Sequence, residues 1–359
     1  MFDHVAAIRR CAAGLAALAM AAGGARLAHA ESGAAGTDDP AADNGAVVLM
    51  YHRFGNQKYP STNVRMEQFK AHIEKLSEDK YTVMRLSQLV AALENDEPLP
   101  EHAVAITVDD AYKSFYERAW PLLKDAGMPV TLFAATKPIE QGYASIMSWD
   151  QVEAVDAHEL GRVANHTHTH AHMPQQSLET NREDIARTQT LLEEHLGRTP
   201  TLFSYPYGEY TPEIAELVAE AGFTAAFGQH SGPIARTNPM HTLRRYAVNE
   251  AYGGMDRFNL IVNSLPLPVR ELTPDQLVLD DKHNPPAYGF TAHETVQNLD
   301  SLTCYASDRG KVDREILGNR VEVRLESPLP EGRSRINCTM PTRGGRWRWL
   351  GQQFAVPRE

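Results

Sequence analysis

Short apolar runs recur along the chain from residue 46, and helical patterns lie between many of them. Met66, Phe69, Ile73 and Leu76, for example, are three or four positions apart, as on one face of a helix. Strands that alternate with helices pair in parallel through right-handed crossovers. The predicted strands are residues 46–51, 103–108, 129–134, 162–165, 201–205, 224–227 and 242–248. The pattern therefore predicts an α/β domain over residues 46–268, a distorted (β/α)7-like barrel.

The pattern changes after Leu265-Pro266-Leu267-Pro268. Residues 321–325 alternate apolar and polar side chains, as does the region around residues 346–350, and Pro and Gly clusters separate such runs. Alternation with period two indicates strands that bury one face. We therefore predict that residues 270–359 form a small accessory β-sandwich domain. Trp347 and Trp349 could stack on sugar rings, but a core position is the better interpretation for two Trp on one alternating strand.

The first thirty residues have the pattern of a secretory signal peptide. Arg9 and Arg10 precede an apolar run over residues 11–22, and Ala28-His29-Ala30 suits a cleavage site before residue 31. The run is too short to cross a bilayer, and no other segment is apolar enough. We expect an exported protein, periplasmic or secreted, in which residues 31–45 form a flexible leader.

Charge and cysteine content narrow the picture further. The formal net charge is -11, and removing residues 1–30, with three basic residues and one acidic residue, leaves -13. An acidic surface disfavours nucleic acid as a partner. Two cysteines, Cys304 and Cys338, remain after cleavage, and in an exported chain we expect them to form a disulfide bond. The oligomeric state is left open.

Two polar clusters follow strand-like runs, where α/β folds place their chemistry. Asp109-Asp110 ends residues 103–108, and His166-Thr167-His168-Thr169-His170-Ala171-His172 follows residues 162–165. Imidazole nitrogens and one carboxylate suit a divalent transition ion, and a second carboxylate can take a proton from water. Alone, an Asp pair is more often a turn or a cap, and a His-rich tract can be a loose tail. The position of both clusters after strands favours metal-assisted hydrolysis.

Three motifs together resemble the polysaccharide deacetylase family, a NodB-like group of carbohydrate esterases. They are Thr107-Val108-Asp109-Asp110-Ala111, then residues 166–170, then Phe203-Ser204-Tyr205-Pro206-Tyr207-Gly208. Met50-Tyr51-His52 and Met147-Ser148-Trp149-Asp150 resemble the branch that acts on exported poly-N-acetylglucosamine. The resemblance implies hydrolytic removal of N-acetyl groups from an N-acetylglucosamine-containing polysaccharide. Alternatives are an O-acetyl esterase, or a catalytically weak glycan-binding protein on the same scaffold.

The resemblance also implies roles for individual residues. Asp109 would be the catalytic base, and Asp110, His166 and His170 would hold the metal, preferably Zn²⁺, with Co²⁺ or Ni²⁺ as alternatives. His168 and His172 have the same spacing as His166 and His170, and they stay open as a second register. The backbone N–H of Tyr207 would stabilise the oxyanion, and Trp149 and His52 would contact the substrate.

The sequence departs from the family pattern at two functional positions. Ser204 stands near the place where many members carry an arginine that orients the base. The late Leu-x-His motif that supplies a general acid is missing, and Leu243-Arg244-Arg245-Tyr246 occupies that region, with His230 and His241 as loose candidates. The group that protonates the leaving amine is therefore not assigned.

Overall fold

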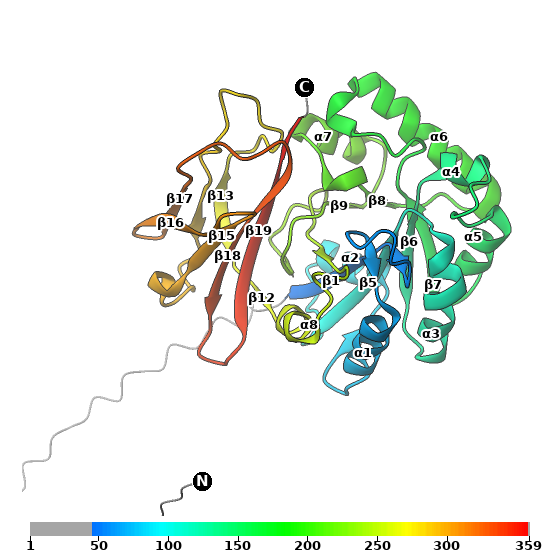
Figure 1. Ribbon diagram of the computed structural model, residues 1–359, viewed down its shortest axis with the longest axis horizontal. Helices are drawn as coiled ribbons and strands as arrows, with labels where there is room; N and C mark the ends of the chain where they lie inside the picture. Colours follow the sequence, from blue (N-terminus) through cyan, green and yellow to red (C-terminus); the bar gives the residue numbers. More distant parts are fainter. Residues whose placement is uncertain (1–44, 358–359) are drawn as a thin grey trace, which may run out of the picture. The chain divides into compact units, whose positions relative to one another are not determined.

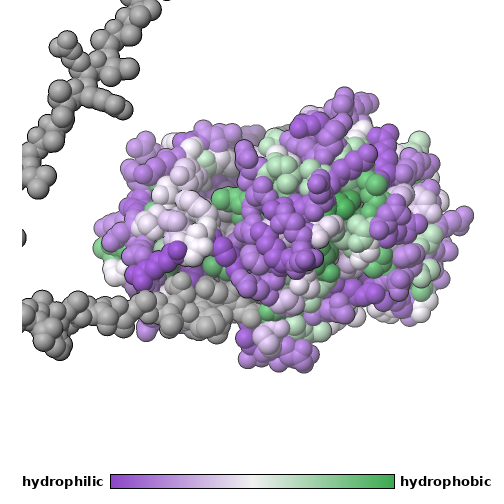
Figure 2. All heavy atoms as spheres, turned by 90° about the horizontal axis from the view of Figure 1, so that it is seen from below, coloured by the Kyte–Doolittle hydropathy of each residue, from purple (hydrophilic) through white to green (hydrophobic). Residues whose placement is uncertain are grey.

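A computed structural model describes residues 45–357 of the 359-residue chain. The predicted signal peptide and residues 31–44 of the predicted leader lie outside the described residues, and Gly45 begins the first strand. None of the helices described in residues 45–357 is long and apolar enough to cross a membrane. The face seen in Figure 2 is largely hydrophilic, and apolar residues occupy limited areas of it.

The first part of the described chain is an α/β half-barrel (Figure 1). Six parallel strands are hydrogen-bonded in chain order: β1 (Gly45–Tyr51), β5 (Ala103–Asp109), β6 (Val130–Ala134), β7 (Gly161–Asn165), β8 (Leu202–Ser204) and β9 (Ala225–Phe227). β11 (Tyr246–Ala247) pairs in parallel with β1, β4 (Thr82–Val83) pairs in parallel with β5, and β10 (Ile234–Ala235) pairs antiparallel with β1. Each predicted strand run therefore contains a strand, and the α/β class is confirmed.

Helices follow the strands because buried parallel sheets need cover on both faces. Every residue of β5 is buried, and so is every residue of β1 except Gly45. The helices are α1 (Met66–Leu76), α2 (Leu86–Glu94), α3 (Trp120–Asp125), α4 (Thr136–Glu140), α5 (Trp149–Asp156), α6 (Leu178–Leu196), α7 (Pro212–Glu220) and α8 (Met255–Val262). A π-helical turn, η1 (Phe115–Ala119), leads into α3, and β2 (Arg53–Phe54) pairs with β3 (Asn63–Val64).

The segment after β9 connects that strand to β1. Leu243 donates its N–H to the carbonyl of Ala226, its own carbonyl accepts from Gly228, and β11 follows beside β1. Residues just after Leu243 therefore lie between β9 and β1, close to the carboxyl ends of β5 and β8.

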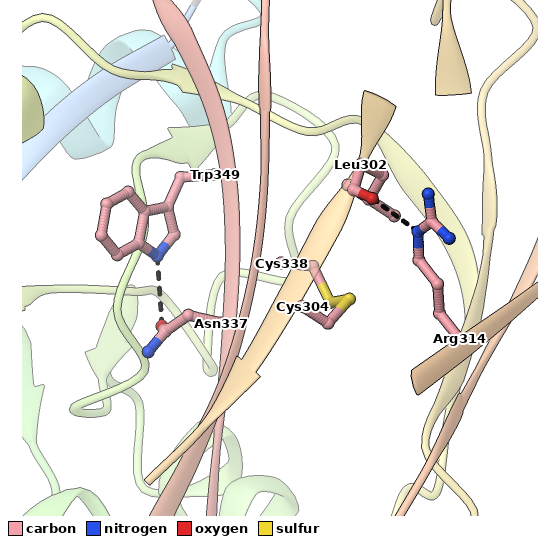
Figure 3. The surroundings of a disulfide bond; sticks show 6 residues. All are labelled: Leu302, Cys304, Arg314, Asn337, Cys338 and Trp349. Atoms are coloured by element: carbon pink, nitrogen blue, oxygen red, sulfur yellow. Dashed lines mark hydrogen bonds between the residues drawn. A yellow bond between two sulfur atoms is a disulfide. The ribbon is translucent and has the colours of Figure 1, made fainter. Parts of the chain in front are cut away.

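The C-terminal part is a second sheet, as the change of sequence pattern predicts. Its hydrogen-bonded order is β12 (Leu265–Pro266), β19 (Trp347–Val356), β18 (Gly332–Pro341), β15 (Thr303–Ala306), β16 (Gly310–Leu317), β17 (Arg320–Arg324), β14 (Gly289–Ala292) and β13 (Val269–Thr273). Cys304 and Cys338 are opposite each other on β15 and β18 and form the expected disulfide (Figure 3). The indole of Trp349 donates to Asn337 on the neighbouring strand and packs against Tyr246 of the half-barrel.

The second sheet shares a hydrophobic core with one side of the half-barrel. Phe203 and Leu217 belong to the same buried cluster as Leu277 and Phe354. The chain enters the C-terminal sheet directly after α8, because β12 pairs with β19 inside that sheet. Within the described chain, the two parts are therefore packed together at residue 268 and not separated by an exposed linker. The C-terminal sheet lies directly against the loops that follow β8 and β9.

Candidate metal centre

The Asp109-Asp110 pair lies where β5 ends and the chain turns sharply. Asp109 is the last residue of the strand and is fully buried. Asp110 and Ala111 follow with φ angles of 74° and 53°, which is uncommon for residues with a Cβ atom. The N–H of Asp110 donates to the carbonyl of Phe133 on β6. The turn separates the two carboxylates, so that Asp109 stays inside the barrel and Asp110 reaches a cavity.

The histidine tract begins where β7 ends and is a fixed loop rather than a loose tail. The side chain of Asn165 accepts from the N–H of Thr167, and the hydroxyl of Thr167 accepts from the N–H of His170. Asp184 on α6 accepts from the N–H groups of His168 and Thr169. These bonds hold the φ angles of Thr167 and His170 at 63° and 54°. The conformation of the loop is therefore fixed by several polar contacts at once.

Asp110, His166 and His170 converge on one point. His170 Nε2 lies 3.0 Å and His166 Nε2 lies 3.4 Å from Asp110 Oδ1, and one ligand atom from each residue falls within 4.8 Å of the others. His166 donates from Nδ1 to the carbonyl of Ser204 at 2.7 Å, which leaves the Nε2 lone pair facing the cavity. His166 Nε2 and Asp110 Oδ1 are buried and make no hydrogen bond within the described residues. Two imidazoles and a carboxylate with unsatisfied buried atoms fit a divalent transition ion.

His168 and His172 do not join this cluster. His168 Nε2 lies 3.6 Å from Glu140, and its Nδ1 is within 2.9 Å of the Thr136 hydroxyl. His172 Nδ1 is 2.6 Å from Glu209, and its ring stacks on Tyr207. Each of the two therefore has a local carboxylate partner, and the geometry favours the register of His166 and His170.

Asp109 is paired with an arginine to which sequence reasoning gave no role. Arg245, fully buried, donates from Nη1 to Asp109 Oδ1 at 2.7 Å and from Nη2 to Asp109 Oδ2 at 2.8 Å. Nη2 also donates to the hydroxyl of Ser204 at 2.7 Å, and Nε donates to the carbonyl of Gly228 at 3.1 Å. Ser204 thus stands where the family pattern has an arginine, and Arg245 supplies the guanidinium from the segment after β9. The sequence signal that could have pointed to Arg245 is a charged residue inside the buried run 242–248.

Charge balance explains how these groups ionise. Burial raises the pKa of Asp109, but Arg245 and His166 outweigh burial, so the net pKa is below its ordinary value. Burial also raises the pKa of Asp110, but His166 and His170 outweigh burial, so the net pKa is well below its ordinary value. Burial lowers the pKa of His166, and the two aspartates raise it above 6.5 overall. The negative potential that favours a protonated imidazole here equally favours a bound cation.

Asp110 and His170 lie on the wall of a cavity of about 600 Å³. His52 and Tyr207 also line it, and β18 contributes Gly332, Arg333 and Arg335. Trp149 is not among the lining residues: it begins α5 and stacks on His195 of α6, with ring centroids 3.8 Å apart. The structure therefore brings His52 and Tyr207 to the cavity and places Trp149 elsewhere.

The two loose candidates for the general acid also lie away from this wall. His230 Nδ1 accepts from the backbone N–H of Gln353, and His241 Nε2 donates to the carbonyl of Phe223. Neither lines the cavity that holds Asp110. Among the described imidazoles on that wall, His52 is the one outside the Asp110 cluster.

Comparison with known proteins agrees with the motifs. Residues 96–226 match the family model of polysaccharide deacetylases, so the chain carries a polysaccharide deacetylase domain. The putative polysaccharide deacetylase YxkH of Bacillus subtilis is 26% identical over 207 residues, which cover 58% of this chain and 72% of that protein. The poly-beta-1,6-N-acetyl-D-glucosamine N-deacetylase of Escherichia coli is 24% identical over 255 residues, which cover 59% of this chain and 38% of that protein.

A solved structure, IcaB from Ammonifex degensii, superposes with a TM-score of 0.53 at 26% identity, covering 61% of this chain and 96% of that one. The α/β half-barrel is therefore the NodB-like deacetylase fold.

Proposed function

We propose that this protein is an exported, metal-dependent hydrolase that removes N-acetyl groups from an N-acetylglucosamine-containing polysaccharide. The observation that carries the proposal is the convergence of Asp110, His166 and His170 beside the separately held Asp109. A metal triad with a second, off-metal carboxylate is the arrangement that metal-assisted hydrolysis needs. The names of the relatives support the substrate class.

The trio would hold a divalent ion, preferably Zn²⁺, through His166 Nε2, His170 Nε2 and an oxygen of Asp110. When bound, the ion would polarise the acetamide carbonyl and lower the pKa of a water molecule in the site. The hydrogen bond from His166 Nδ1 to Ser204 fixes the ring orientation and makes Nε2 the free nitrogen. The polar loop bonds around Thr167 do the same for His170.

Asp109 would act as the general base. Arg245 keeps it ionised at neutral pH and fixes the direction of both carboxylate oxygens. Asp109 Oδ2 lies 3.9 Å from His166 Nε2, close enough to take a proton from water beside the metal position. Asp109→Asn should retain one metal per chain while turnover falls by about two to four powers of ten, the usual size of a general-base contribution. Near-normal turnover would rule out this role.

Tyr207 and His52 would contact the substrate around the reacting carbon. The resemblance assigns the Tyr207 N–H to the oxyanion, and the turn at Pro206–Gly208 brings that residue to the cavity wall. His52 reaches the same wall from the end of β1. Collapse of the tetrahedral intermediate would break the C–N bond, and the proton that Asp109 takes from water would pass to the departing nitrogen, so that the products are acetate and a free amine.

The scaffold that we propose for this chemistry is the distorted (β/α)7-like barrel, with residues 46–268 as the catalytic domain. Residues 270–359 would be a β-sandwich accessory domain. Residues 1–30 would direct export to the periplasm or the medium. Mass spectrometry of the secreted protein, with a new N-terminus at residue 31, is the measurement that checks the last point.

Acetate release tests the proposal against its alternatives. We would incubate the purified protein with N-acetylated and O-acetylated polysaccharide, before and after chelation and after restoring Zn²⁺. The proposal expects release from the N-acetylated polymer, loss on chelation and recovery with metal. Release from the O-acetylated polymer alone would identify an esterase, and binding without any release would identify a glycan-binding protein. Activity that is untouched by chelation would contradict the metal assignment.

A further inference from the structure

The turn that carries Tyr207 has a backbone conformation that needs support from outside. Tyr207 has φ 59° and ψ 1°, in the left-handed region, and Gly208 follows with φ 71°. A left-handed conformation is unfavourable for a residue with a Cβ atom and persists only where surrounding contacts enforce it. The structure therefore has to contain groups that hold this peptide in place.

Those groups come from the C-terminal sheet. Gln353 on β19 donates from Nε2 to the carbonyl of Tyr207 at 3.0 Å, and Arg333 on β18 donates from Nη1 to the same oxygen at 3.4 Å. Gln353 is only 2% exposed, so its hydrogen bond is made away from competing water. The guanidinium of Arg333 also lies 5.2 Å from the centre of the Tyr207 ring. His172 also contacts Tyr207: its ring stacks on the Tyr207 ring with centroids 4.0 Å apart.

The same sheet also contacts Gln229, the residue on which this turn rests. A Cβ atom on Gly208 would lie 2.5 Å from the backbone nitrogen of Gln229, so the turn rests directly on Gln229. Arg335 on β18 donates from Nε to the carbonyl of Gln229 at 3.3 Å. Arg335 is also the register partner of Gln353 across the β18–β19 ladder. The two supports therefore belong to one rigid pair of strands.

We propose that β18 and β19 are positioning elements of the candidate active site, acting on Tyr207 through Gln353 and Arg333. This inference rests on the proposed function, in which the Tyr207 N–H faces the oxyanion. The C-terminal sheet lies outside residues 96–226, which match the family model, so the support is a feature of this chain rather than of that domain alone. On this view the C-terminal sheet completes the catalytic centre and is not an appendage for binding polymer.

The first test is amide hydrogen exchange of a peptide spanning residues 203–210 in the intact chain. The N–H of Gly208 donates to the carbonyl of Tyr205, and the N–H of Tyr205 donates to the carbonyl of Phe227 on β9, so both report on the order of this segment. Gln353→Met removes the donor at nearly constant volume. Gln352→Met is the matched control, because Gln352 is the next residue, is 4% exposed, and contacts His230 instead of Tyr207. Faster exchange in Gln353→Met but not in Gln352→Met is expected, and equal exchange in the two variants would overturn the proposal.

The second test separates positioning from general damage by kinetics. With a β-1,6-linked N-acetylglucosamine oligomer, Gln353→Met should lower kcat by about 10- to 100-fold, somewhat less than the ~10²- to 10³-fold loss for removing an oxyanion donor outright. KM and metal content should stay near wild type, because the lost contact matters in the transition state. Loss of metal in Gln353→Met, or an equal fall of kcat in Gln352→Met, would contradict the positioning role. If the wild type releases no acetate, the proposed function fails. Hydrogen exchange then still decides whether Gln353 holds the turn at Tyr207.

Discussion

Replacing Arg245 by methionine should destabilise the fold by about 3–5 kcal/mol, as when one partner of a buried ion pair is removed. Both side chains of the Arg245–Asp109 pair are fully buried. The substitution removes two hydrogen bonds to Asp109, of 2.7 and 2.8 Å, and one to the hydroxyl of Ser204. The loss arises chiefly because the Asp109 carboxylate then remains in the barrel interior without its bidentate partner.

A double-substitution cycle isolates that contribution. Asp109→Asn in the Arg245→Met background removes the stranded charge, so the double variant should be more stable than Arg245→Met alone by about 2 kcal/mol. Urea unfolding with chelator present measures each free energy without a contribution from metal. Arg244→Met is the matched control: Arg244 is also buried, and it donates to the carbonyl of Gly351 without an ion-pair partner among the described acidic residues.

Asp109→Asn should therefore not restore any of the lost stability in the Arg244→Met background. Our account of the pair is refuted if Arg245→Met costs less than about 1 kcal/mol. It is also refuted if the two substitutions at 245 and 109 add to within about 0.5 kcal/mol.

Three further predictions concern the metal, acid and the disulfide. His170→Ala should lower bound metal well below one ion per chain whereas His168→Ala should retain it, and metal analysis showing the reverse would move the register by two residues. Burial lowers the pKa of His72 from 6.5 to about 4, against the raising effect of the Gly253 carbonyl. Between those pH values the unfolded chain takes up a proton that the folded chain does not, so stability should fall with acidification by up to about 3 kcal/mol. His72→Gln should flatten this slope in urea titrations, and an unchanged slope would show that His72 is protonated in the fold. Reducing the Cys304–Cys338 bridge, whose ends have a sequence separation of 34, should cost about 4 kcal/mol in the chain-entropy model, and an unchanged thermal midpoint would refute that.

The strands could be predicted from sequence because burial on both faces forces nearly continuous apolar runs, as in β1 and β5. The clustering of Asp110 with the histidine tract follows from the same logic, since parallel strands present their carboxyl ends at one edge. The partner of Asp109 could not be found in this way. Its arginine directly precedes β11, and the hydrophobic pattern of that segment does not say which carboxylate the arginine meets.

Aromatic residues show a similar limit. Trp149 and Tyr207 were both predicted to lie at the substrate site, but only the structure distinguishes them. Trp149 begins α5 and stacks on His195 of α6, whereas Tyr207 lies in a turn on the cavity wall. The contribution of β18 to that cavity was also invisible, because it depends on how two sheets dock and not on the pattern within either.

The ion pair between Asp109 and Arg245 spans 136 residues of the chain, and that separation has a consequence for folding. The carboxylate lies on β5, which can form early with its neighbours β1 and β6, but its counter-ion is reached only after β9 has been laid down. A half-assembled sheet therefore carries an unbalanced charge where its interior will be, and water must stay there until the last segment arrives. Such long-range closure is slow in folding because the loop entropy is lost before the contact is gained. Asp109 therefore gains its counter-ion only when the segment after β9 has joined the sheet.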